Sequence, residues 1–534
     1  MELELVLTLV LAVVIALLIV AEWARIPYPI LLVLGGLALA LAPGVPEVDL
    51  DPELVLLILL PPLLYAAAYF TPLRELRRNL RPIGMLAVGL VLATMVGVAL
   101  VARAVLGFGW AEAFVLGAIV SPTDPVAATA IARRLRVPAR IVTIVEGESL
   151  INDGTALVAY KFAVAAVLTG SFSLIEASGE FVLTVVGGVA VGIAVGWLVA
   201  AVRRRIDNSP VEVTIALATA YFAYLPAEAI GVSGILAAVT VGIYMGRLTS
   251  RLTTPATRIQ GLAVWEIVTF LLNSALFVLV GLQLPTVTDG IEGIGTFELI
   301  TEGALVTATV IALRIAWVFP LTYLPRALSR RLRDAGPAQP WQETMIVAWT
   351  GIRGAVSLAA ALALPFAVDT GGAFPERERI IFLVFSVILG TLLLQGLTLP
   401  ALISRLGFDD AGQEAELEEI EARLRAADAA LERVDELASE EWALDDTVER
   451  VRGAFRYRQR RFAARSRDGE FDGGLGGDGV DYETRSQAYQ RLVRELIEVQ
   501  RTVVIEMRDR GEIDDDVLRR IERELDLEDS RLEI

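Results

Sequence analysis

The sequence predicts an all-α membrane protein of about thirteen transmembrane helices in two inverted repeats, followed by a small helical tail. Long apolar runs, arginines gathered in alternate loops and an abrupt change of composition support this fold class. Of the 534 residues, 55% are hydrophobic. Residues 1–408 carry 28 acidic and 26 basic side chains, whereas residues 409–534 carry 36 and 21. We therefore predict a transmembrane domain over 1–408 and an acidic, helical, cytoplasmic region over 409–534.

Thirteen apolar runs define the predicted spans. A helix needs about 20 apolar residues to cross the hydrocarbon core of a bilayer. The second run is short, and the boundary between the eighth and the ninth rests on the corner at Gly231. The runs lie at residues 3–24, 28–42, 52–70, 82–107, 111–134, 139–169, 178–204, 209–229, 231–248, 256–283, 297–325, 341–367 and 377–404.

The loops between these runs alternate in charge. Those after odd-numbered runs contain arginines, as in the clusters Arg74–Arg81 and Arg133–Arg140, whereas those after even-numbered runs are mainly acidic. Basic loops face the cytoplasm. We therefore predict a multi-pass protein of the cell (inner) membrane with its N-terminus outside and its tail in the cytoplasm.

Two amino-acid types are missing from the chain. It contains no cysteine and no histidine. Disulfides, thiol nucleophiles, zinc–thiolate sites, imidazole metal ligands and Ser-His-Asp triads are therefore excluded. We predict neither an enzyme nor a bound cofactor, and any response to pH must come from other side chains.

Spans five and twelve each contain a polar interruption. In span five, two prolines bracket a Thr-Asp pair in Ser121–Pro125, so backbone hydrogen bonds must be lost there. Span twelve contains Arg353 between two glycines, in Gly351–Gly354. Broken helices at membrane depth line cavities or lie inside protein. Two of opposite direction in matching places indicate an inverted-repeat secondary transporter, with spans 1–6 and 8–13 as the repeats.

Span six contains a cluster of polar side chains within residues 146–154. Ser149 and Asp153 are four residues apart and share a helix face, and Glu148 and Asn152 form the adjacent stripe. An ionisable residue inside a span is a functional hypothesis by default, although any one of them is also compatible with a structural hydrogen bond. Several acids at comparable depth in spans five and six argue against a purely structural role.

Two arginines lie deep in the later spans. Glu148 and Arg353 have the depth to form an ion pair, which is more often scaffold than ion site. Arg314, in span eleven, either neutralises the carbonyl ends of broken helices or pairs with an acid that the sequence does not identify. Glu146, nearest the cytoplasmic end of its span, is also compatible with a solvated position.

Three motifs in these spans resemble the monovalent cation:proton antiporter-1 family, in particular bacterial, NhaP-like sodium/proton exchangers. They are Ser121–Ala127, Glu146–Ala156 and Thr350–Leu358. Leu60–Tyr65 in span three is also similar, and the resemblance covers residues 1–408. It implies an antiporter that works as a homodimer in the lipid bilayer.

The resemblance also implies roles for individual residues. The predicted ion site comprises Asp153, Asn152, Ser149, Thr123 and Asp124. Within it, sodium would bind Asp153, Ser149 and the backbone at Thr123, and Asp124 would balance the charges of the helix ends.

Two further features follow from the same resemblance. Glu148 and Arg353 would form the family's structural ion pair. Many members carry an acid after the Pro-Pro pair in span three, where this chain has Ala66 and two further alanines. The predicted site therefore lacks that carboxylate.

These residues predict exchange of a monovalent cation, sodium or also lithium, for protons. A protonated Asp153 is neutral and cannot hold a cation, so cation and proton compete for one carboxylate under alternating access. Asn152 forms hydrogen bonds but takes up no proton, which predicts electroneutral one-for-one exchange. The sequence does not separate sodium/proton from potassium/proton antiport. An ion channel is a less favoured alternative, because a channel needs pore-lining rings and a continuous path, whereas this chain has one carboxylate at two broken helices.

The tail has the pattern of a small helical region. An apolar stripe from Leu417 to Val434 at spacings of three and four predicts an amphipathic helix, in a coiled coil or a small bundle. The basic segment 450–467 fits either an anionic lipid surface or a solvated helix face. The Gly-rich segment 468–481 predicts a flexible linker, with helices near 482–510 and 514–526. We expect a regulatory or assembly role for this region.

Overall fold

The computed structural model describes most of the chain. It covers residues 27–42, 55–170, 174–283, 294–328, 339–369, 371–407, 409–440, 442–463, 482–513 and 515–532, with scattered positions between 12 and 23 and between 285 and 291. These residues are helical and contain a single isolated β-bridge, from Ala367 to Ala373. The chain separates into two compact units, Met1–Phe408 and Asp409–Ile534, which are described in turn.

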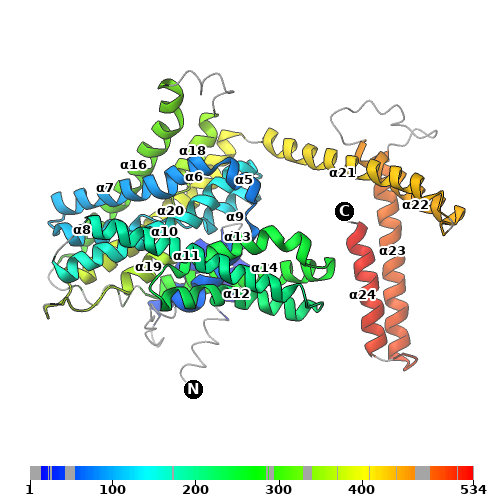
Figure 1. The fold of residues 1–534 in the computed structure, drawn as a ribbon, viewed down its shortest axis with the longest axis horizontal. Coiled ribbons are helices and arrows are strands. Elements are labelled where there is room, and N and C mark those ends of the chain that lie inside the picture. Colours follow the sequence, from blue (N-terminus) through cyan, green and yellow to red (C-terminus); the bar gives the residue numbers. More distant parts are fainter. Residues whose placement is uncertain are drawn as a thin grey trace. The chain divides into compact units, whose positions relative to one another are not determined.

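Helices account for the architecture of the first unit (Figure 1). Their bounds are α2 Tyr28–Ala40, η1 Val55–Leu59, α4 Leu60–Phe70, α5 Leu73–Arg78, α6 Leu80–Gly84, η2 Met85–Leu90, α7 Val91–Ala104, α8 Trp110–Val120, α9 Val126–Arg134, α10 Ala139–Thr169, α11 Leu174–Arg203, α12 Ser209–Ala229, α13 Gly234–Leu252, α14 Pro255–Leu282, α16 Thr296–Leu328, α18 Trp341–Trp349, α19 Ala355–Leu362 and α20 Arg377–Leu406.

Seven helical segments in the described residues are long and apolar enough to cross a membrane, and four shorter helices are also apolar. The seven are Leu80–Ala104, Ala139–Thr169, Gly179–Arg203, Ser209–Ala229, Pro255–Leu282, Thr296–Pro325 and Arg377–Leu406. Each coincides with a predicted span, which confirms the all-helical fold class. The predicted span 3–24 lies mainly outside the described residues, so the total of thirteen stays a prediction.

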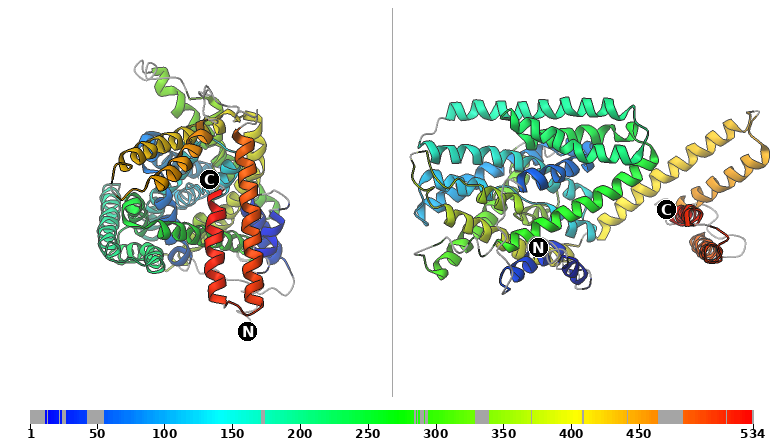
Figure 2. Two further views of the ribbon diagram at one scale, coloured as in Figure 1. Left: turned by 90° about the vertical axis from the view of Figure 1, so that its right-hand side faces the viewer. Right: turned by 90° about the horizontal axis from the view of Figure 1, so that it is seen from below.

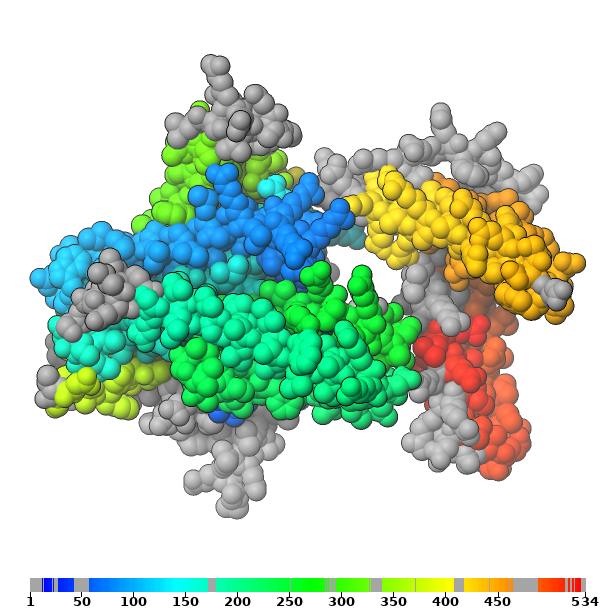
Figure 3. Space-filling model, viewed as in Figure 1, coloured from blue at the N-terminus to red at the C-terminus, as the bar shows by residue number. Residues whose placement is uncertain are grey.

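The helices of this unit pack around two main apolar cores. One core is built from α6 to α10, α16 and α18 to α20, together with α2 and the end of α14. The other is built from α4 and α11 to α14. Outside these cores, α11 leaves large apolar side chains uncovered, among them Val182, Leu183 and Trp197. The space-filling view shows the α11, α12 and α14 segments forming one side of the unit (Figure 3). Such a surface suits lipid tails better than water.

Glycines allow some of these helices to approach each other closely. Where α2 crosses α14, a methyl group added at Gly36 would collide with the backbone of Val278, and one at Gly281 would collide with that of Val33. Small residues at such crossings let helix backbones pack directly, which is typical of helices in membranes.

Two of the predicted spans are broken, as expected. The chain is helical in α8, unwound from Ser121 to Pro125, and helical again in α9. In the same way, α18 and α19 are separated by the unwound residues 350–354. The two prolines account for the first break, because they supply no backbone donor at that depth.

Four helices lie in the described residues of the second unit. They are α21 Asp409–Leu437, α22 Asp445–Ala463, α23 Tyr482–Asp509 and α24 Asp515–Leu532. Gln459 of α22 donates to Asp428 of α21 at 2.6 Å, and Arg501 of α23 pairs with Asp526 of α24 at 2.6 Å. Figure 2 shows α23 and α24 lying side by side as an antiparallel pair. The predicted linker 468–481 lies outside the described residues.

Candidate ion site at two broken helices

The two unwound segments meet inside the first unit. The backbone N–H of Asp124 donates to the carbonyl of Ile352 at 2.8 Å, so the breaks lie directly against each other. The Asp124 carboxylate accepts from the N–H of Val126, at the start of α9, at 2.9 Å. It also packs against the backbone of Gly354, at the start of α19, where a side chain would not fit. Asp124 therefore carries negative charge between the positive N-terminal ends of two half-helices.

Two buried arginines compensate the opposite ends of the half-helices. Arg314, from α16, donates through Nε and Nη2 to the carbonyl of Val347 near the end of α18, at 3.1 and 2.9 Å. Arg353 donates through Nε to the carbonyl of Val120, the last residue of α8, at 2.9 Å. Both carbonyls lack an intrahelical partner at a helix end and carry partial negative charge. Arg314 thus contacts a carbonyl end of a broken helix, which is one of its two sequence interpretations, and Arg353 makes an equivalent contact.

The predicted ion pair between Glu148 and Arg353 is wrong, because Glu148 pairs with Arg314. The Nη1 and Nη2 atoms of Arg314 contact the two carboxylate oxygens of Glu148, the second at 2.8 Å. Both side chains are essentially excluded from solvent, with exposures of 0% and 1%. The pair has the planar, two-point geometry that makes arginine–carboxylate contacts strong. The guanidinium of Arg353 is instead directed to the carbonyls of Val120 and Gly351.

The predicted ion-site residues of α10 lie at this crossing. Ser149 and Asp153 are 5% and 7% exposed. Asn152 lies beside them, and its side-chain amide donates to Oγ1 of Thr123 at 2.8 Å. Thr123 in turn donates to Glu148 at 3.4 Å. Asn152 therefore connects α10 to the unwound segment between α8 and α9.

A cavity of about 300 Å³ reaches these residues. It is lined by the carboxylates of Asp153 and Asp124 and by the hydroxyl-bearing residues Ser149 and Thr123, which share a common space. Asn152 is not among the lining residues, so its contact with this space passes through Thr123. A set of oxygen atoms of this kind is suited to a hard cation.

The mouth of the same cavity is charged. Arg133 of α9 and Glu146 of α10 line it and form an ion pair at 2.6 Å. Their side chains are 65% and 22% exposed, so this end of the cavity communicates with solvent. Glu146 is thus partly solvated, in accordance with one of its two sequence interpretations.

The cavity is also lined by polar residues that the sequence alone does not single out. Thr269 and Asn273 of α14 line the cavity, as does Ala66 of α4. Ala66 marks the position at which the family resemblance implies an acid, and the wall is apolar there. The available signal was a pair of polar residues in an otherwise apolar span, but nothing in the sequence indicates that α14 faces α10.

Comparison with known proteins identifies the family. The family model described as "Sodium/hydrogen exchanger, transmembrane" matches residues 9–405. The chain belongs to this family. It is 39% identical over 515 residues to an uncharacterized Na⁺/H⁺ exchanger of Mycobacterium tuberculosis, which covers 95% of this chain and 92% of that protein. This exchanger is also 36% identical over 388 residues to a sodium, potassium, lithium and rubidium/H⁺ antiporter of Bacillus pumilus, over 71% of this chain and 58% of that protein.

A solved structure supports the fold. This exchanger is similar to the sodium proton antiporter MjNhaP1 of Methanocaldococcus jannaschii, with a TM-score of 0.60 at 20% identity, over 76% of this chain and 99% of that one. The predicted family resemblance and the prediction of cation/proton antiport are thereby confirmed. The protein is a multi-pass membrane transporter.

Proposed function

We propose that this exchanger moves sodium against protons, one for one, and that Asp153 binds each of them in turn. The supporting observation is the state of this carboxylate. Asp153 is buried and lines the cavity, yet the described residues give it neither a hydrogen bond nor an ion pair. Asp124 is different, because it already accepts from the backbone of Val126. A buried carboxylate without a protein partner needs a proton or a cation to neutralise it.

Oxygen ligands for the cation would come from three residues. Asp153 supplies the charge, Ser149 a hydroxyl oxygen, and Thr123 the unwound backbone whose free carbonyls are available at a broken helix. The hydrogen bond from Asn152 to Thr123 orients the unwound segment Ser121–Pro125 toward α10. A neutral, protonated Asp153 would not hold sodium, so the two substrates exclude each other.

The stoichiometry follows from the charges already in place. Glu148 is neutralised by Arg314, Asp124 faces the helix N-termini, and Asn152 does not titrate. One carboxylate thus changes its state in each cycle, and one sodium ion replaces one proton. No bound cofactor is required by this scheme.

Alternating access would bring Asp153 to each side of the membrane. The cavity mouth at Arg133 and Glu146 adjoins the basic loop 133–140, which is predicted to be cytoplasmic. We therefore interpret the present cavity as the cytoplasmic opening.

Transport in proteoliposomes tests the function directly. Purified exchanger is reconstituted with an internal pH indicator and an imposed proton gradient, and sodium, lithium or potassium chloride is then added. Sodium, and lithium with it, should dissipate the gradient without generating a membrane potential. A potential that develops during sodium-driven proton movement would contradict the one-for-one stoichiometry, and proton movement without counter-flux would contradict antiport itself.

Potassium is the second candidate cation. The Bacillus pumilus relative is named for potassium and rubidium as well as sodium and lithium. In the same assay, half-maximal dissipation at a lower potassium than sodium concentration would replace sodium with potassium as the substrate. For the variant Asp153→Asn, the matched control is Asp369→Asn, which makes the same chemical change at an exposed acid that does not line the cavity.

The oligomeric state of the protein and its orientation in the membrane are also part of this proposal. We propose a homodimer in the cell (inner) membrane with its N-terminus outside and its tail in the cytoplasm, on the basis of the arginine-containing odd-numbered loops and the family resemblance. Because the chain has no cysteine, the variant Ser439→Cys carries a single thiol in the tail. A membrane-impermeant maleimide should label it in inside-out vesicles and not in right-side-out ones, and light scattering of the purified protein should give the mass of a dimer.

A further inference from the structure

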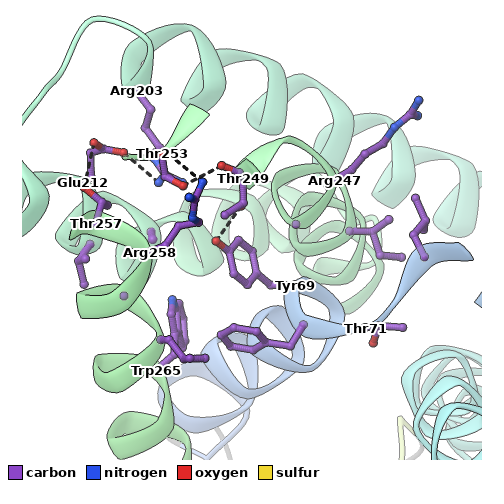
Figure 4. A pocket seen from close by; sticks show the side chains of 18 of the residues that line it. Tyr69, Thr71, Arg203, Glu212, Arg247, Thr249, Thr253, Thr257, Arg258 and Trp265 are labelled. Atoms are coloured by element: carbon purple, nitrogen blue, oxygen red, sulfur yellow. Dashed lines mark hydrogen bonds and ion pairs between the residues drawn. The ribbon is translucent and has the colours of Figure 1, made fainter. Parts of the chain in front are cut away.

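A second cavity lies at the ends of six helices of the first unit (Figure 4). It has a volume of about 470 Å³ and is lined by residues at the end of α4, the start of α5, the end of α11, the start of α12, the end of α13 and the start of α14. This volume is within the range of ligand-binding sites in proteins. The cavity is distinct from the cation cavity, although Phe70 contributes to the walls of both.

One wall contains an incompletely satisfied buried arginine. Arg203, the last residue of α11, is 3% exposed, and its Nη2 donates to Glu212 of α12 at 3.1 Å. Its Nε and Nη1 atoms are buried and have no hydrogen-bond partner within the described part of the chain. Leaving such donors unpaired is costly, and charged donors cost the most. Arg203 therefore lines the cavity with two buried N–H groups that still require an acceptor.

The remaining walls reinforce the positive charge. Arg247 and Arg258 also line the cavity, whereas Glu212 is the single acid among the lining residues. Figure 4 shows Arg203 and Arg258 reaching into the pocket from different helices, while Arg247 points away. Arg258 donates one hydrogen bond, to the carbonyl of Thr253 at 3.3 Å, which leaves further guanidinium donors.

Hydroxyl groups complete the polar side of the pocket. Thr249 donates to the hydroxyl of Tyr69 at 2.7 Å, and both residues line the cavity. Thr257 donates to the second oxygen of Glu212 at 3.5 Å, so that this acid is occupied by its own neighbours. The acid therefore does not provide a free site for a cation.

We propose that this cavity binds an oxyanion of the phosphate type. A cation would be repelled by the arginines, and an apolar molecule would leave the buried donors of Arg203 unsatisfied. A tetrahedral oxyanion offers several acceptors at once, which matches guanidinium groups converging from α11 and α14. The site lies outside the ion pathway proposed above and does not depend on it.

A phosphate group for this cavity is available from two sources. One is soluble inorganic phosphate, and the other is the phosphate group of an anionic phospholipid. Phe70 and Leu262 line the cavity and are 46% and 57% exposed, so apolar wall lies next to the polar one. The proposal is for the phosphate group, and the experiment separates the two sources.

The test uses the full chain in nanodiscs. In the first arm the discs contain only phosphatidylcholine, and binding of inorganic phosphate is measured by ³¹P line broadening and by thermal stabilisation, with chloride at equal ionic strength as reference. In the second arm phosphatidylglycerol is included, and retained lipid is measured by native mass spectrometry. Arg258→Gln removes a charge at the pocket, and Arg251→Gln is the matched control because Arg251 is an exposed arginine of α13 that does not line the cavity.

The expected result is that phosphate or phosphatidylglycerol binds and that Arg258→Gln weakens this binding by about tenfold, the effect of losing one hydrogen bond between charged groups. Arg251→Gln should leave it unchanged. Binding in the first arm identifies soluble phosphate as a ligand, whereas binding only in the second identifies the lipid. The proposal is overturned if neither probe binds, or if binding is equally strong in Arg258→Gln.

A second variant tests the buried arginine without leaving an isolated charge. The combined substitution Arg203→Met and Glu212→Met removes both members of the pair, which proteins tolerate better than removal of one. It should abolish phosphate binding while the protein keeps its elution volume and its cation/proton exchange. Phosphate binding retained in this folded variant would overturn the assignment of Arg203.

Discussion

Acidic side chains have contrasting surroundings in the two units of the chain. In the first unit Glu148, Glu212 and Glu302 are buried, and each contacts an arginine, whereas the buried Asp153 has no such partner in the part of the chain that the structure describes. In the tail, acids such as Glu436 are exposed and contact arginines one helical turn away. A buried charge must be paired or neutralised by a ligand, but an exposed charge is solvated by water. The effect of removing an acid should therefore fall steeply from Asp153 to the tail.

The largest effect is expected at Asp153. In Asp153→Asn the cavity keeps its shape, but no group remains that can alternate between a proton and a cation. Sodium-dependent proton movement in proteoliposomes should fall to that of empty liposomes, while the yield of folded protein is unchanged. Asp369→Asn is the control and should transport normally. Sodium/proton exchange by Asp153→Asn would remove this residue from the mechanism.

The next effect concerns the buried pair of Glu148 and Arg314. Removing one partner leaves an unpaired buried charge, so Arg314→Ala should destabilise the protein by about 3–5 kcal/mol. The expected result is a loss of folded protein on size-exclusion chromatography and a lower melting temperature. Arg314→Met combined with Glu148→Met should recover much of this loss, because no isolated charge remains.

A double-mutant cycle distinguishes the two arginines. The melting temperatures of single and double variants of Glu148 with Arg314 should give a large coupling, and those of Glu148 with Arg353 a small one. Arg353→Gln should lose mainly the hydrogen bond to Val120, with a cost of about 1–3 kcal/mol. Equal couplings would mean that both arginines share the carboxylate in the membrane.

The same pair marks the limit of what could be predicted from sequence. The breaks in spans five and twelve were readable, because Pro122, Pro125 and the glycines around Arg353 remove the means to continue a helix. The depth of Glu148 along its span was readable too. Its partner was not, since Arg314 and Arg353 lie at similar depths and depth contains no information about which span is the neighbour.

The packing of helices against one another also explains why other features of the ion site could not be predicted from sequence. The family resemblance includes Asn152 in the ion site, but its contact with Thr123 depends on how the unwound segment crosses α10. Thr269 and Asn273 face the cavity because α14 packs opposite, which is a property of the assembled bundle. Periodicity within one helix identifies a face and leaves its partner open.

The pH dependence of transport also tests the role of the unpaired Asp153. Because protonated Asp153 is neutral and cannot hold a cation, acid should compete with sodium. Once protons occupy most sites, each further unit of acidification should raise the apparent KM for sodium by up to about tenfold, with little change in the maximal rate. Initial rates in proteoliposomes over a range of pH and sodium concentration measure this. A fall in maximal rate at constant KM would indicate that protons act elsewhere, and no histidine is present to do so.

A smaller effect is expected at Asn152. The variant Asn152→Ala removes the 2.8 Å hydrogen bond to Thr123 and leaves the carboxylate of Asp153 in place. A hydrogen bond contributes about 1 kcal/mol, so the KM for sodium should rise by about fivefold while exchange stays electroneutral. The KM and the membrane potential are measured in the same reconstituted system. Thr155→Ala, at another buried polar residue of α10 that does not line the cavity, is the matched control.

The smallest effect is expected in the tail. Arg433 and Glu436 are paired at 2.5 Å but are 66% and 65% exposed, so Arg433→Gln should cost about 0.5 kcal/mol or less. Leu525 of α24, by contrast, is only 4% exposed, and Leu525→Ala should destabilise the tail by about 2–5 kcal/mol. Hydrogen exchange of the full-length protein, followed by mass spectrometry of tail peptides, measures both. Strong deprotection by Arg433→Gln would mean that the charges of the tail, and not its apolar contacts, hold its helices together.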